Sequence, residues 1–146
     1  GPMCPALANA KLGFHVRGDT PSSSRLYDTI LSGTVPIFTH PKQYQVLPEW
    51  IDWQAISYFI HVNKSNPSDF VQQLRAILAD SSTYQQKFEL VMANRHLVDW
   101  TALYPFDTYM YMLQAHLYPA TRHNPATFFG LHPTKSILQL PPPVSS

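Results

Sequence analysis

The segment from Val16 to Phe38, VRGDTPSSSRLYDTILSGTVPIF, connects two short apolar runs through a loop of small polar residues and an amphipathic stretch. The apolar and β-branched residues over 12–16 and 35–38 are typical of buried parallel strands, in which apolar residues do not alternate with polar ones. The residues between the runs predict a helix over 21–32, with Thr20 as its N-cap and Gly33 just beyond its end. The apolar stripe of this helix consists of Leu26, Tyr27, Ile30 and Leu31.

Downstream residues predict a third strand over 56–62 and three further helices. The first helix begins at Asn66-Pro67, the second at Ser82 or Thr83 and extends past Leu97, and the third covers about 107–117. Three strands with helices between them predict an α/β fold, in which the strands lie side by side in chain order. The expected architecture is a partial Rossmann-like, doubly wound parallel sheet with a helical C-terminal part.

Composition limits the function classes. The chain has 146 residues, of which 45% are hydrophobic and 13% charged, and its formal net charge of +1 provides no electrostatic footprint for nucleic acid. The single cysteine, Cys4, allows no internal disulfide and no cysteine-based metal cage. The expected organisation is a tag remnant (Gly1-Pro2) with an N-terminal segment over 1–10, one domain over 11–118, and an extended or disordered Pro-rich tail over 119–146.

The loop that follows the first strand carries the candidate binding site. A loop that leaves a parallel strand and enters a helix lies at the carboxyl edge of the sheet, where doubly wound folds bind ligands. There the first backbone N–H groups of the helix, together with hydroxyl groups and guanidinium cations, can hold a phosphate, and a carboxylate can accept from sugar hydroxyls. The candidate residues are Arg17, Gly18, Thr20, Ser22, Ser23, Ser24, Arg25 and Asp28.

From residue types alone, an ordinary capped helix is the favoured interpretation of the same loop, because serines cap helices and an Arg25–Asp28 pair is common on helix surfaces. The seven histidines show no close i, i+4 metal-ligand spacing, and His15 is expected to pack within a strand. Asn63-Lys64-Ser65 is an N-glycosylation acceptor pattern in a predicted loop. The tyrosines and methionines of the last helix are expected to form core or a domain-facing surface.

The stretch GDTPSSSRLYDTILSGTVPIF, followed by VLPEWIDWQAISYFIHV, resembles the exostosin family, the inverting glycosyltransferases of family 47. The family run contains Gly-Asp-Ser/Thr, then Ser-Arg-Arg-Leu-Phe/Tyr-Asp, then Gly-Cys-Val-Pro-Val-Ile, and later Leu-Pro-Phe-Glu and Phe-Ser-Val. The matching positions are Gly18, Asp19, Thr20, Arg25, Leu26, Tyr27, Asp28, Gly33, Val35, Pro36, Leu47 and Pro48. Three positions depart from the run: Ser24 replaces its first arginine, Thr34 its cysteine, and Trp50 follows Glu49 where Phe-Glu is expected.

This resemblance implies a donor-binding portion of a two-domain GT-B enzyme that transfers a sugar from a nucleotide-sugar, expected to be a UDP-sugar, to a glycan or glycoconjugate. Ser23, Ser24 and Arg25 would hold the donor diphosphate without a required metal, and Asp28 would hold the ribose. The catalytic base and the glycan-binding surface would belong to an N-terminal domain outside this chain, which alone would be inactive. The parent enzyme would be membrane-associated in the Golgi or ER lumen.

Two other functions remain open. The chain could be a non-catalytic interaction module, or a free-standing nucleotide- or phosphate-binding domain with the same fold. The strand over 12–16 would also have an unpaired edge, for which we expect self-association, a partner chain or coverage by the N-terminal segment.

Overall fold

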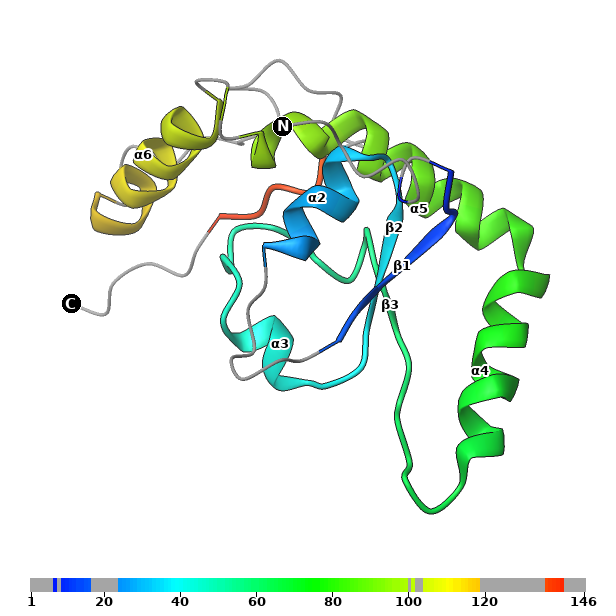
Figure 1. The fold of residues 1–146 in the computed structure, drawn as a ribbon. Helices are drawn as coiled ribbons and strands as arrows, with labels where there is room; N and C mark the ends of the chain where they lie inside the picture. Colours follow the sequence, from blue (N-terminus) through cyan, green and yellow to red (C-terminus); the bar gives the residue numbers. More distant parts are fainter. Residues whose placement is uncertain are drawn as a thin grey trace.

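The computed structural model describes residues 7, 9–16, 24–99, 101, 104–118 and 136–140. Three strands form one parallel sheet in the order β1-β2-β3, surrounded by helices (Figure 1). In Figure 1 α3 lies at the lower end of the sheet, where β2 ends, and α5 crosses its upper end. The elements are β1 Leu12–His15, α2 Arg25–Leu31, β2 Val35–Phe38, α3 Lys42–Gln45, β3 Tyr58–Phe59, α4 Pro67–Ala79, α5 Ser81–Asn94, the 3-10 helix η1 Arg95–Val98 and α6 Tyr104–Leu117.

The sheet confirms the predicted α/β class, the parallel direction and the strand order. Leu12 pairs with Val35 and Ile37 with Tyr58, so β2 is the central strand. The third strand is shorter than the predicted span of 56–62. The last ladder bond runs from the N–H of Ile60 to the carbonyl of Phe38 (2.9 Å). The pairing ends there because the N–H of His40, which a longer ladder would need, donates to the side chain of Gln43 on α3 instead.

The described part of helix α2 begins at Arg25, and residues 17–23 lie outside the described residues. The backbone N–H groups of Tyr27 and Asp28 donate to the carbonyl of Ser24 (3.0 and 3.2 Å). The predicted helix start at Pro21, with Thr20 as N-cap, falls on residues outside the described part of the chain and stays a prediction.

The end of α2 is the predicted glycine stop. Gly33 has φ of 76°, a left-handed conformation that glycine adopts without steric cost. Its N–H donates to the carbonyl of Ile30 (2.9 Å), and the N–H of Thr34 donates to the carbonyl of Thr29 (3.0 Å). These two bonds form a Schellman motif, which turns the chain directly into β2.

The later helices follow the predicted pattern with shifted boundaries. Pro67 opens α4 as expected, and α5 begins one residue early because the Asp80 carboxylate accepts from the N–H of Thr83 (3.0 Å) and caps it. Helix α6 begins at Tyr104 rather than near residue 107. The short helices α3 and η1 were not predicted, and Leu97 lies in η1 rather than in α5.

Two tight contacts hold β1 in place. A Cβ at Gly13 would lie 2.7 Å from Cγ2 of Thr29, so only glycine lets β1 approach α2 this closely. Buried Thr34, at the position of the family cysteine, donates through its hydroxyl toward the carbonyls of Leu7 (2.8 Å) and Ala10 (3.2 Å). Leu7 and Ala10 are thus tied to the residue that precedes β2, and among the described residues β1 is an edge strand. Self-association, a partner chain or coverage by the N-terminal segment at this edge stays a prediction.

Residues 136–140 are extended and belong to the packed core. Ile51 and Leu138 form an antiparallel bridge, and the N–H of Asp52 donates to the carbonyl of Ile137 (2.7 Å). The Ile137 side chain is 4% exposed and packs with residues of α2, β2, α5 and η1. Burial of Ile137 offsets the entropy cost of ordering this part of the chain. The rest of the predicted Pro-rich tail, 119–135 and 141–146, lies outside the described residues, and its extended or disordered state stays a prediction. The domain boundaries themselves remain a prediction.

Candidate functional site at the carboxyl edge of the sheet

The loop from β1 to α2 begins at the carboxyl end of β1, as the sequence predicted. Of the eight candidate residues, Arg17, Gly18, Thr20, Ser22 and Ser23 lie outside the described residues. Ser24, Arg25 and Asp28 are described, and all three are exposed at the start of α2. The structure brings these three together on one turn of helix, and the role predicted for them in binding stays untested.

Burial of the opposite face directs Arg25 and Asp28 toward solvent. Leu26 and Ile30 are 1% and 2% exposed and pack in the core, so the helix presents its polar side outward. The backbone groups next to these candidates are already used: the hydroxyl of Thr29 donates to the carbonyl of Arg25 (2.7 Å), and Ser32 donates to the carbonyl of Asp28. The Arg25 guanidinium and the Asp28 carboxylate lie on the exposed side of this turn.

Gln43, which the sequence analysis did not select, organises the carboxyl edge of the sheet. Its side chain is fully buried on α3, and its Oε1 accepts from the N–H groups of Thr39 (2.9 Å) and His40 (2.8 Å). Its Nε2 donates to the carbonyl of His15 (2.6 Å), the last residue of β1. One amide thus joins the ends of β1 and β2 and fixes the point from which the candidate loop departs.

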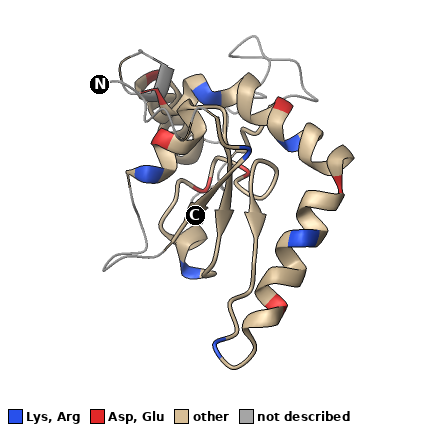
Figure 2. Cartoon of the chain, turned by 45° about the vertical axis from the view of Figure 1, so that its right-hand side comes forward, with Lys and Arg blue, Asp and Glu red and all other residues tan. Residues whose placement is uncertain are grey.

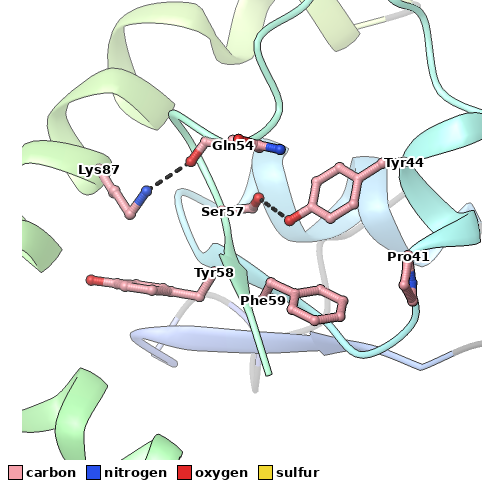
Figure 3. Close-up of a pocket in the computed structure, with 7 residues that line it drawn as sticks. All are labelled: Pro41, Tyr44, Gln54, Ser57, Tyr58, Phe59 and Lys87. Atoms are coloured by element: carbon pink, nitrogen blue, oxygen red, sulfur yellow. Dashed lines mark hydrogen bonds between the residues drawn. The ribbon is translucent and has the colours of Figure 1, made fainter. Parts of the chain in front are cut away.

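A pocket of about 520 Å³ lies along β3 (Figure 3). Figure 3 shows Tyr44 and Phe59 on one side of β3 and Tyr58 and Lys87 on the other. Lys87 Nζ donates to the carbonyl of Gln54 (2.7 Å) and lies 5.2 Å from the ring centroid of Tyr58. Burial lowers the pKa of the Lys87 ammonium, partly opposed by the charge of Asp52, and burial raises the pKa of Tyr58. The pocket is therefore aromatic, with one partly desolvated cation.

The histidine and charge patterns add no second site. His15 is 2% exposed and lies edge-on to Phe38 with ring centroids 5.1 Å apart, which agrees with its predicted packing role. Within the described part of the chain, no three His, Cys, Asp or Glu side chains form a group that could hold a metal ion. Figure 2 shows that the strands carry no charged residues and that both signs of charge are interspersed along the helices.

Two further features concern glycosylation and membrane insertion. Residues 63–65, the glycosylation pattern, are exposed in a turn in which Asn63 Oδ1 accepts from the N–H of Ser65 (2.9 Å), and their modification stays a prediction. Among the described helices, none has the length and apolar character needed to cross a membrane.

The chain belongs to the Exostosin GT47 domain family, which it matches over residues 5–77, that is 73 of its 146 residues. The match contains β1, α2, β2 and β3 and ends within α4. It therefore covers the sheet and the whole candidate loop, and it confirms the family that the motif suggested.

A curated protein is similar over a segment of nearly the same length. "Probable arabinosyltransferase ARAD1" of Arabidopsis thaliana is 33% identical over 72 residues, which are 49% of this chain and 16% of that protein. The aligned part of the chain thus spans about a sixth of the length of this relative. No solved structure matches the chain.

Proposed function

We propose that this chain is the donor-binding portion of an exostosin-like inverting glycosyltransferase with a GT-B architecture. The observation that carries the proposal is the family match over residues 5–77, because it includes the Gly18–Asp28 motif on a loop that leaves the carboxyl end of a parallel strand. Ligands of open α/β sheets bind at that edge. The exposed Arg25 and Asp28 side chains support the proposal, because both can reach a ligand without unfolding α2.

The proposed reaction is the attack of an acceptor hydroxyl on the anomeric carbon of a nucleotide-sugar, expected to be a UDP-sugar. The new C–O bond forms as the bond to the diphosphate breaks with inversion, and a base from another part of the full protein takes the hydroxyl proton. Arg25, with Ser23 and Ser24, would stabilise the charge that grows on the diphosphate, and Asp28 would accept from the ribose hydroxyls. No metal is required in this proposal.

The similarity to a probable arabinosyltransferase favours transfer of a pentose to a glycan as the activity of the full protein. A glycan acceptor would be held by a second domain, and a luminal location in the Golgi or ER suits the exposed glycosylation pattern. In this proposal the chain alone is inactive. The interaction module and the free-standing nucleotide-binding domain are the alternatives, and donor binding and donor turnover distinguish them.

Calorimetric titration of UDP and of inorganic pyrophosphate into the chain and its variants tests this proposal. Arg25→Ala removes a charge-assisted contact, and we expect it to weaken binding of both ligands by about ten- to a hundredfold. Asp28→Asn removes only the proposed ribose contact, so it weakens UDP and leaves pyrophosphate unchanged.

Arg75→Ala and Asp107→Asn are the matched controls, because both residues are exposed on other helices. They leave both affinities unchanged if the effect is local to the loop. Unchanged UDP affinity in Arg25→Ala contradicts the proposal, and equal losses of both ligands in Asp28→Asn remove Asp28 from the ribose site.

A further inference from the structure

The pocket along β3 contains three aromatic side chains that the proposed donor site does not use. Tyr44 packs against Phe38 with ring centroids 4.5 Å apart and lies 6.3 Å from Phe59, which fixes its orientation. Phe59 is 40% exposed although it lies in the sheet, and Tyr58 lines the pocket from the same strand. Aromatic faces that remain open beside a pocket favour ligands with a flat apolar face.

The hydrogen bonds inside the pocket determine which of its polar groups can still donate to a ligand and which can accept. Ser57 Oγ donates its proton to the carbonyl of Trp53, so the Tyr44 hydroxyl, 3.0 Å away, donates to Ser57 Oγ. The oxygen of Tyr44 therefore remains an acceptor for a ligand. Lys87 uses one of its three N–H donors on the carbonyl of Gln54, which leaves two donors beside the ring of Tyr58.

We propose that this pocket binds a single sugar ring of a glycan. A sugar ring presents a C–H face that packs on an aromatic ring such as Phe59, and its hydroxyls both donate and accept. They suit the Tyr44 acceptor on one side of β3 and the Lys87 donors on the other, both of which line the pocket. A simple anion fits less well, because it would face the lone pairs of Tyr44. An apolar ligand also fits less well, because it would leave the Lys87 donors desolvated without partners.

Part of the pocket lies at the same edge of the sheet as the candidate donor loop. Pro41 and Tyr44 lie in and just after the turn that follows β2 at the carboxyl edge of the sheet, the edge from which the candidate donor loop also leaves. A sugar in the pocket could thus belong to an acceptor chain. This acceptor role rests on the proposed function, whereas the binding itself rests on the pocket alone.

Saturation-transfer difference NMR with the methyl glycosides of galactose, xylose and arabinose tests the site on the full chain. We expect saturation of the ring protons on one face of at least one glycoside. Phe59→Ala removes an aromatic wall and weakens that binding by about three- to tenfold. Tyr44→Phe keeps the ring and removes the acceptor hydroxyl together with its hydrogen bond to Ser57. We expect it to weaken glycoside binding as well, and an unchanged circular dichroism spectrum and unfolding midpoint show that the loss is not a folding defect.

The matched controls are Phe106→Ala and Lys64→Met, because both residues are exposed outside the pocket, and both variants keep wild-type binding. The proposal is overturned if no glycoside is saturated, if benzyl alcohol binds and no glycoside does, or if Phe59→Ala and Tyr44→Phe leave binding unchanged. Titration of UDP into the same samples separates the two proposals: glycoside binding without UDP binding contradicts only the donor site, and the reverse contradicts only the pocket.

Discussion

At the scale of single residues, Gln43 determines the shape of the carboxyl edge. Its buried amide accepts two backbone N–H groups after β2 and donates to the carbonyl that ends β1. An aliphatic side chain of similar size could fill the same volume but could satisfy none of these three groups. The residue therefore links the length of β3 to the start of the candidate loop, because both depend on the backbone groups that it binds.

We expect Gln43→Leu to lower the free energy of unfolding by about 3 kcal/mol, because it leaves buried backbone donors and a carbonyl without partners. Urea denaturation followed by circular dichroism measures the loss. Gln45→Leu is the control, because Gln45 is exposed on the same short helix, and its effect should stay within about 0.5 kcal/mol. Equal stability of the wild type and Gln43→Leu would show that the buried amide is not needed for stability.

Residue-scale patterns predicted the candidate site only in part. Arg25 and Asp28 could be selected because the order of residues in a motif is visible in the sequence. Gln43 could not, because a glutamine after a strand is usually exposed and no local pattern shows that three backbone groups surround it. The pocket side chains of α3, β3 and α5 were missed for the same reason: they are far apart in the chain and meet only in the fold.

At the scale of elements, the sequence predicted the helices and strands better than their ends. The β1–α2–β2 unit could be predicted because its apolar runs, helical stripe and terminal glycine agree with one another. The predicted start of α2, with Thr20 and Pro21, stays untested, because residues 17–23 lie outside the described residues. Helix α3 has four residues, too few for a helical period to be recognised.

Gly33 ends α2 in a conformation that few other residues adopt. We expect Gly33→Ala to lower the free energy of unfolding by about 1–2 kcal/mol, because its φ is positive. The new Cβ would also lie 2.9 Å from Met92 Sδ, at the end of a flexible side chain that can move. Gly33→Asn is the comparison. Because asparagine tolerates positive φ, the free energy of unfolding measured by chemical denaturation should fall less in Gly33→Asn than in Gly33→Ala. A larger loss of unfolding free energy in Gly33→Asn would indicate that steric crowding, and not the positive φ, causes the destabilisation.

At the scale of the whole molecule, the core is closed by a segment that is distant in sequence. Ile137 packs with residues of α2, β2, α5 and η1, and residues 136–140 pair with the segment around Ile51. The C-terminal part of the chain therefore stabilises the sheet that carries the candidate loop, although it lies outside the family match.

We expect Ile137→Ala to lower the free energy of unfolding by about 2–4 kcal/mol, because it leaves a cavity in a closed core. Removal of residues 136–146 should cost at least as much, whereas removal of 141–146 alone should cost little. Gln139→Ala is the point control, because it removes one exposed side-chain hydrogen bond, from Nε2 to the carbonyl of Glu49 (2.8 Å), while its backbone bonds remain. Thermal and urea unfolding measure these differences, and equal stability of both truncations would contradict a structural role for residues 136–140.

The sequence by itself determined the α/β class, the order and direction of the strands, the glycine end of α2 and the family, because each depends on local periodicity or on an ordered motif. Only the tertiary structure decided where β3 ends, which side chains meet in the pocket along β3, and that residues 136–140 complete the core. The physical reason is that burial and hydrogen-bond satisfaction depend on groups distant in the chain, and these groups become neighbours only when the chain is folded.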